Sequence, residues 1–291
     1  MKRLAMVVLV SCLFFLMGAC SASKQHFGKK GSSEQVSKKS RHVGEKGSGK
    51  HFVKRKIKQK IKWIKCSTPI SFPILMYHSI SNNPGNRLCV PKEQFEHQLE
   101  LLKRNGYYAL DPQEAERVLT KNEKPAERIV WVTLDDGYRD NYASAFKAIK
   151  KTGIKATINL ITSKINCKDP YYVNLDQIEE MKRTGLVSFG SHTVHHLELN
   201  RMSYDQQFQE MNDSKVWLDQ KLNQKTEYLC YPVGRCNNQT AIAAQKAGYS
   251  LATTTQPGLA NVNEGMYGLK RVRIVPDISD SGFIQLLSTG Y

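Results

Sequence analysis

The stretch that decides the fold is RIVWVTLDDG, residues 128–137, an apolar run that ends in two aspartates and a glycine. Its Val, Ile and Trp residues favour a β-strand, and a run that is apolar on both faces predicts a strand buried within a sheet. The adjacent carboxylates of Asp135 and Asp136 repel each other and are costly at a buried strand end. A cation removes that cost if one Asp binds it and the other serves as a base. The plain alternative is an Asp-Gly turn that caps a helix.

Further strand and helix patterns alternate on both sides of this run. The alternation predicts a mainly parallel sheet with helices outside it. Seven strands within residues 66–291 favour a closed or incomplete (β/α) barrel over an open doubly wound sheet. No GxGxxG or phosphate-binding loop follows a strand, which argues against a nucleotide-dependent enzyme. The expected strands are residues 73–77, 128–134, 156–161, 186–189, 228–231, 250–254 and 269–274, and the expected helices are 91–103, one starting at 111–112, 138–151, 175–183, 204–222 and 239–246.

Chemistry in such barrels lies at the carboxyl ends of the strands, where three more segments attract notice. The segment SHTVHH, residues 191–196, follows an expected strand, and the spacing of His192 and His196 suits two imidazoles on one metal. With Asp136 they form a His2Asp set that leaves room for water. YPVG at residues 231–234 is a strand-to-loop turn that could present backbone N–H groups. His78, at the end of the first strand, is either a general acid or a polar cap on the barrel.

At these residues the chain resembles the polysaccharide deacetylases, carbohydrate esterase family 4, which share the nodulation-factor deacetylase homology domain. TLDDG at 133–137 is similar to the first motif of the family and HTVHH at 192–196 to its second. The resemblance covers about residues 70–275. It implies a distorted (β/α)7 barrel that binds Zn²⁺, or another divalent ion such as Co²⁺ or Ni²⁺, through Asp136, His192 and His196.

At three places the sequence differs from the common pattern of the family. In these features it resembles a narrower group, the exported poly-β-1,6-N-acetylglucosamine deacetylases of biofilm formation, whose motifs are circularly permuted. They are MYHSI at 76–80, YPVG in place of Arg-x-Pro-Tyr, and the lack of a late Leu-x-His motif. The resemblance implies Asp135 as base, His78 as acid and the N–H of Val233, where relatives have Tyr, as oxyanion donor. It also implies that Arg271 pairs with the base, with Arg273 as the competing residue.

The implied reaction is hydrolysis of the N-acetyl group of an N-acetylglucosamine polysaccharide, which releases acetate. Peptidoglycan, chitin oligomers and O-acetylated xylan are alternative substrates within the family. A chain that binds glycan without catalysis is the alternative from another class, although an intact Asp135, Asp136, His192 and His196 argues against it.

The amino-terminal part of the chain predicts export. Lys2 and Arg3 precede an apolar run, and Cys20 follows small residues, as in a bacterial lipoprotein signal. We therefore expect a signal peptide at 1–19, a lipid-anchored linker at 20–65 and a catalytic domain at 66–291. The expected location is the outer side of the cytoplasmic membrane, and cleavage after Ala22 with secretion is the alternative.

The basic character of the chain belongs to that linker. The net charge is +17, yet residues 21–65 carry 15 Lys and Arg with two acidic residues, while residues 66–291 carry 26 basic and 24 acidic side chains. The folded part is thus nearly neutral, so we expect no nucleic-acid partner. Residues 51–65 mix apolar and basic side chains, which suits either an amphipathic helix on an anionic surface or a solvated linker that partly packs on the domain.

The cysteines indicate neither a zinc cluster nor a disulfide scaffold. No CxxC spacing occurs among the seven cysteines of the 291 residues. Outside the cell Cys230 and Cys236 could pair, but the odd number of cysteines after Cys20 leaves at least one thiol free.

Overall fold

The computed structural model describes residues 61–291. The expected signal peptide, Cys20 and most of the basic linker lie outside the described residues. Within them, no helix combines the length and the apolar character that crossing a membrane requires.

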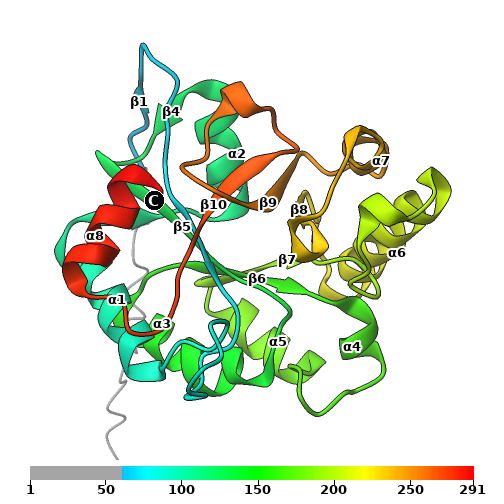
Figure 1. Cartoon of the computed structure of the whole chain (residues 1–291), viewed down its shortest axis with the longest axis horizontal. Helices are drawn as coiled ribbons and strands as arrows, with labels where there is room; N and C mark the ends of the chain where they lie inside the picture. The colour runs from blue at the N-terminus through cyan, green and yellow to red at the C-terminus, as the bar shows by residue number, and fades with distance from the viewer. Residues whose placement is uncertain (1–60) are drawn as a thin grey trace, which may run out of the picture. The chain divides into compact units, whose positions relative to one another are not determined.

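Seven parallel strands close into a barrel, which confirms the expected (β/α)7 architecture (Figure 1). Each of the seven expected strands occurs within a few residues of its expected place. Around the ring they follow the order β2, β10, β9, β8, β7, β6, β5, and β5 pairs again with β2. They are β2 (Ile74–Tyr77), β5 (Arg128–Leu134), β6 (Ala156–Leu160), β7 (Val187–Ser191), β8 (Tyr228–Cys230), β9 (Leu251–Pro257) and β10 (Leu269–Arg273).

The barrel is distorted on the side of β7, β8 and β9. In the described chain β7 and β8 share a single residue pair, Ser191 with Leu229, and the register between β9 and β10 shifts. A short strand, β3 (Tyr107–Ala109), pairs with the outer edge of β5. β7 and β8 therefore pair only near their carboxyl ends, next to the expected site, and separate toward their amino ends.

Helices surround the ring, as the alternation predicts (Figure 1). Their starts follow local capping chemistry: Asp111 caps the second helix, Pro112 is its first residue, and Glu114 completes a capping box. The helices are α1 (Lys92–Arg104), α2 (Pro112–Lys121), α3 (Phe146–Thr152), α4 (Thr162–Asn166), α5 (Leu175–Arg183), α6 (Tyr204–Leu222), α7 (Asn238–Lys246) and α8 (Asp280–Thr289).

One expected helix begins later than its sequence suggests. The expected helix at 138–151 is a π-helical turn, Asn141–Ala145, followed by α3, because Tyr138 instead pairs with Tyr172 of the α4–α5 loop. The segment 61–65 is not helical either. Its β1 (Ile64–Lys65) pairs with β4 (Glu123–Lys124), and Trp63 lies under the guanidinium of Arg117 at 4.2 Å.

Alternation along the strands decides which side chains face the barrel interior. On β5, Val130, Val132 and Leu134 pack in the core shared with α1, α3 and α5, whereas Trp131 packs in the core inside the barrel. Asp135 continues the inward series of Trp131 and Thr133. By the same alternation His78 follows Ile74 and Met76 inward on β2, and Arg271 follows Leu269 inward on β10.

Candidate active site and metal centre

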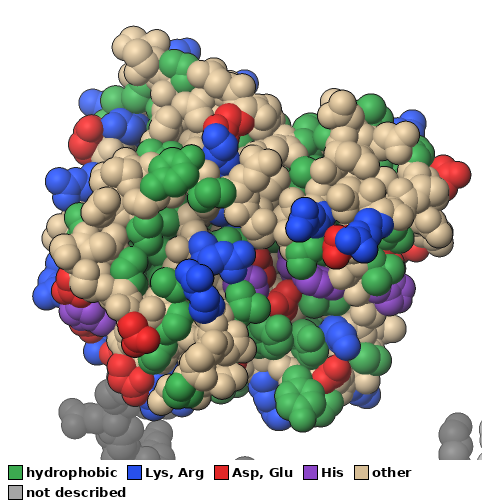
Figure 2. Space-filling model, in the orientation of Figure 1, with side chains coloured by type: hydrophobic (Ala, Val, Ile, Leu, Met, Phe, Trp, Pro, Cys, Tyr) green, Lys and Arg blue, Asp and Glu red, His purple; other side chains and the backbone are tan. Residues whose placement is uncertain are grey.

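The carboxyl ends of β2, β5, β7 and β8 bring the expected residues to one end of the barrel. In Figure 2 the face is hollowed at its centre, where His and acidic side chains show between groups of Lys and Arg. β2 lies directly beside β5 in the ring, and the N–H of Asp135 donates to the carbonyl of Tyr77 at 2.9 Å. This pairing places His78 next to Asp135, although 56 residues separate them in the chain.

Asp136, His192 and His196 form the first cluster. Their ligand atoms all lie within 4.8 Å of one another. Oδ1 of Asp136 is 3.4 Å from Nε2 of His192 and 3.5 Å from Nε2 of His196. Asp136 reaches this position because its φ is +73°, and Gly137 follows at φ +75°. The positive φ of Gly137 favours glycine, and a Cβ there would also lie 2.7 Å from the Cδ2 of Leu160, which would have to move.

These three residues fit a divalent ion. With zinc bonds of about 2.0–2.2 Å, neighbouring ligands of a tetrahedral site lie about 3.3–3.6 Å apart, as the nitrogen-to-oxygen distances here do. Oδ1 of Asp136 is buried, and no residue of the described chain offers it a hydrogen bond. Nδ1 of His192 donates to the carbonyl of Cys230 at 2.7 Å, which leaves the Nε2 lone pair for a ligand bond.

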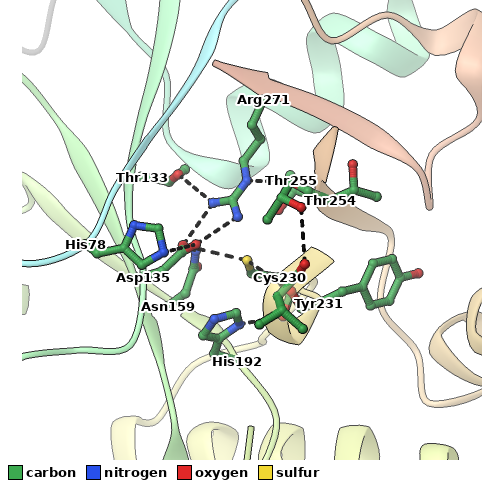
Figure 3. A network of polar contacts seen from close by, with 12 residues as sticks. His78, Thr133, Asp135, Asn159, His192, Cys230, Tyr231, Thr254, Thr255 and Arg271 are labelled. Carbon is green, nitrogen blue, oxygen red and sulfur yellow. Dashed lines mark hydrogen bonds and ion pairs between the residues drawn. The ribbon is translucent and has the colours of Figure 1, made fainter. Parts of the chain in front are cut away.

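A second group of ligand atoms, from Asp135, His192 and Cys230, also lies within 4.8 Å. It fits a metal less well, because the oxygens of Asp135 are already engaged. Oδ1 accepts from Nη1 of Arg271 at 2.9 Å and from Asn159 at 2.8 Å, and Oδ2 accepts from Nη2 of Arg271 at 2.8 Å (Figure 3).

The Asp135–Arg271 pair is completely enclosed: Asp135 is 1% exposed and Arg271 is 0% exposed. Arg271 also donates through Nε to the carbonyl of Thr254 at 2.7 Å. Arg273, the competing candidate, lies two residues further along the same face of β10 and is exposed at the mouth. The structure therefore places Arg271, and not Arg273, against Asp135.

His78 and Val233 lie on the rim. Nε2 of His78 is 3.7 Å from Oδ2 of Asp135. Val233 belongs to the turn Pro232–Gly234 and has a φ of +47°. Within residues 61–291 its N–H has no hydrogen-bond acceptor, and the residue is 49% exposed. A free N–H at a strand end is the group that an oxyanion requires.

Burial and charge shift the pKa values of both aspartates downward. Burial alone would raise the pKa of Asp135, but the Arg271 guanidinium outweighs it and holds that pKa far below its usual range. Burial likewise opposes ionisation of Asp136, and His192 more than compensates, so its pKa is lowered. Both carboxylates are thus charged at neutral pH.

The histidines differ from one another. Burial lowers the pKa of His78 more than Asp135 and Asp136 raise it, and burial followed by the charge of His192 lowers the pKa of His196. Although burial lowers the pKa of His192, Cys230 and Asp136 raise it above its ordinary value. His192 would therefore release a proton on binding a cation.

Two residues that contact Asp135 were not predicted from the sequence. Asn159, on the inner face of β6, donates to Asp135, and Cys230 donates its S–H to the same carboxylate over 3.6 Å. A polar residue inside the apolar strand ATINL was the available signal for Asn159. Cys230 is buried and forms no disulfide with Cys236, and the other three cysteines of the described chain, Cys66, Cys89 and Cys167, are free as well.

Comparison with known proteins identifies the family of the chain. The family model described as "Polysaccharide deacetylase" matches residues 122–252, a range that contains Asp135, Asp136, His192 and His196 but neither His78 nor Arg271. A Bacillus subtilis (strain 168) protein assigned to the polysaccharide deacetylases, YxkH, is 42% identical over 283 residues, 97% of each chain.

Two further relatives carry more specific names. The structure of the Streptococcus pyogenes deacetylase PplD in complex with acetate is similar with a TM-score of 0.73 and 41% identity, over 76% of this chain and 99% of that one. A poly-beta-1,6-N-acetyl-D-glucosamine N-deacetylase of Staphylococcus aureus is 28% identical over 225 residues, 73% of this chain and 75% of the relative. The resemblance noted from the motifs thus extends over about three quarters of this chain or more in each of these relatives.

Proposed function

Because the chain belongs to the polysaccharide deacetylase family, we propose that it is a metal-dependent N-deacetylase of a β-linked N-acetylglucosamine polysaccharide, with poly-β-1,6-N-acetylglucosamine as the first candidate. Members of this family are hydrolases that remove acetyl groups, and the chain is therefore a hydrolase. The observation that carries the proposal is the cluster of Asp136, His192 and His196, in which a buried oxygen lacks a partner, directly beside an ionised Asp135.

Asp136, His192 and His196 would hold Zn²⁺, Co²⁺ or Ni²⁺. A bound divalent ion lowers the pKa of water and polarises a carbonyl oxygen. Asp135 accepts the proton of the attacking water as the new carbon–oxygen bond forms. Because Arg271 keeps Asp135 a weak base, the proton does not remain there, and His78, 3.7 Å away, is placed to receive it.

The N–H of Val233 donates to the oxygen that becomes negative as the acetamide carbon turns tetrahedral. His78 then donates a proton to the nitrogen as the carbon–nitrogen bond breaks, which leaves acetate and a free amine. Arg271 touches neither substrate nor water in this scheme: it holds Asp135 in its orientation and charge state.

A second substrate class, peptidoglycan, is favoured by two arginines at the mouth. Arg273 faces it from the end of β10, and the loop that carries Arg87 pairs with Ser79, directly after His78. In the described chain neither guanidinium is paired with a carboxylate. After burial, the charges of Arg271 and Arg87 lower the pKa of Arg273, as expected for like charges held close together. Such a mouth attracts substrates that bear carboxylates, as peptide-substituted glycan does.

Acetate release from a panel of defined substrates tests the proposal. It contains β-1,6-linked and β-1,4-linked N-acetylglucosamine oligomers of equal length, peptidoglycan fragments and acetylated xylan, each assayed with and without Zn²⁺ after chelation. Metal-dependent release from the β-1,6 oligomer is expected. Preference for peptidoglycan that disappears in Arg273→Gln would select the second class, and no release from any substrate would overturn the proposed activity.

We also place the enzyme on the outer side of the cytoplasmic membrane, held by a lipid on Cys20 and by the basic linker. Each basic residue of the linker near an anionic surface adds about 1 kcal/mol to the attachment that the lipid provides. Fractionation of cells that express wild type or Cys20→Ala tests this: the variant should move to the medium. If both proteins are found wholly in the medium, cleavage after Ala22 replaces lipidation.

A further inference from the structure

Helix α6 contributes a buried carboxylate to the loop between the two expected histidine ligands, and the scheme above leaves it unused. Glu210 is 8% exposed. Its Oε2 accepts the backbone N–H groups of Val194 at 3.1 Å and His195 at 2.9 Å. Its Oε1 accepts from Nδ1 of His195 at 2.6 Å. One carboxylate thus engages three donors from residues that lie between His192 and His196.

This loop needs such support because its backbone is strained. Thr193 has a φ of +65° and His196 one of +60°. The left-handed conformation costs a non-glycine residue about 1–2 kcal/mol, and it persists only where the surroundings impose it. N–H groups of the first turn of α4 bind the carbonyls of Thr193 and Val194 at 3.2 and 3.1 Å. Glu210 binds the opposite, N–H side, so the loop is held from both sides.

The donors explain why the residue is a glutamate. A carboxylate accepts on both oxygens, whereas an amide accepts on one and donates from the other. Here one oxygen serves the backbone and the other serves the imidazole ring. A buried charge is costly unless it is satisfied in this way. The pair also gives a role to His195, whose side chain is 60% exposed and contributes no ligand atom to the Asp136 cluster.

We propose that Glu210 is a positioning residue: by binding the backbone of residues 194–195, it sets the spacing of His192 and His196 at the metal. This inference rests on the proposed metal site. It predicts that metal affinity depends on the acceptor at position 210, although no atom of Glu210 belongs to the ligand set.

Co²⁺ binding, followed by its visible absorption in chelator competition, tests the role with the full-length protein. Glu210→Ala should raise the Co²⁺ dissociation constant about 10–100-fold, the usual effect of losing a residue that orients a metal ligand. Glu210→Gln should recover most of the affinity, because its amide oxygen can still face the two backbone N–H groups while His195 changes tautomer. Asp213→Asn, an exposed position three residues along α6, is the matched control and should bind as wild type does.

Wild-type Co²⁺ affinity in folded Glu210→Ala would overturn the inference, even if its metal-free melting temperature fell, since that result describes a purely structural residue. If the alanine variant does not fold, Glu210→Asp provides the same test, because its carboxylate is one methylene too short to reach all three donors. Failure of the wild type to bind Co²⁺ would instead count against the proposed metal site itself.

Discussion

Removing one partner of the Asp135–Arg271 pair should greatly lower the free energy of unfolding, because the other partner is left buried as an unpaired charge. Both side chains are enclosed, and two hydrogen bonds of 2.9 and 2.8 Å join them. Asp135→Asn leaves a buried guanidinium without its counter-charge, and Arg271→Met leaves a buried carboxylate. Breaking a buried pair in this way costs about 3–5 kcal/mol.

The double variant buries neither charge. Its loss of stability should therefore be smaller than the sum of the single losses, by about 2–3 kcal/mol. For a domain of this size 1 kcal/mol corresponds to about 2–4 °C, so each single variant should melt about 6–20 °C lower. Urea unfolding and calorimetry in the presence of a chelator measure these values without a contribution from bound metal. Strictly additive losses would refute the reasoning.

The single variant Asp135→Asn also separates catalysis from metal binding. Asp135→Asn should keep its metal, because the Asp136 cluster does not include Asp135. Its rate should nevertheless fall about 10²–10⁴-fold, the usual contribution of a general base. Metal content by mass spectrometry and acetate release decide this, and near wild-type turnover would assign the base elsewhere.

His192→Ala should lose both bound metal and activity, and an active variant free of metal would remove His192 from the ligand set. Gly234→Ala should reduce the rate about 10²-fold, because a Cβ there would lie 2.4 Å from a backbone nitrogen of β9 and shift the turn. Val233→Ala, which keeps the N–H, is its control and should retain the wild-type rate. Burial, and then the hydrogen bond to Glu114, raise the pKa of Tyr108 to about 12. Because this pKa is higher in the folded than in the unfolded protein, the protonated Tyr108 stabilises the fold below about pH 10. That contribution is lost as the pH rises above this value. Urea midpoints should therefore fall from pH 10 to 12, and constant midpoints would contradict this.

Local patterns in the sequence predicted the strands and most helices because strand alternation, capping and glycine punctuation act over a few residues. Asp111 and Pro112 mark the start of α2 as expected, and each ring strand has its run of apolar residues. The patterns missed α4 and α8, and they missed β3, which is three residues long and depends on its pairing with β5. Tyr138 shows the same limit, since a contact with Tyr172 replaces the helical turn that its own segment favours.

The sequence by itself determined the chemical inventory of the site: two carboxylates at one strand end, and two histidines four residues apart at another. Their separations are short, so local backbone geometry alone brings each set together. Only the tertiary structure decided that β2 closes the ring against β5 and places His78 beside Asp135, and that Arg271, not Arg273, lies level with that carboxylate. Strand register and ring closure join residues 57 to 136 positions apart, and no local pattern encodes such pairings. The clamp by Glu210 and the unpartnered oxygen of Asp136 likewise arise only when α6 and the strand ends are packed together.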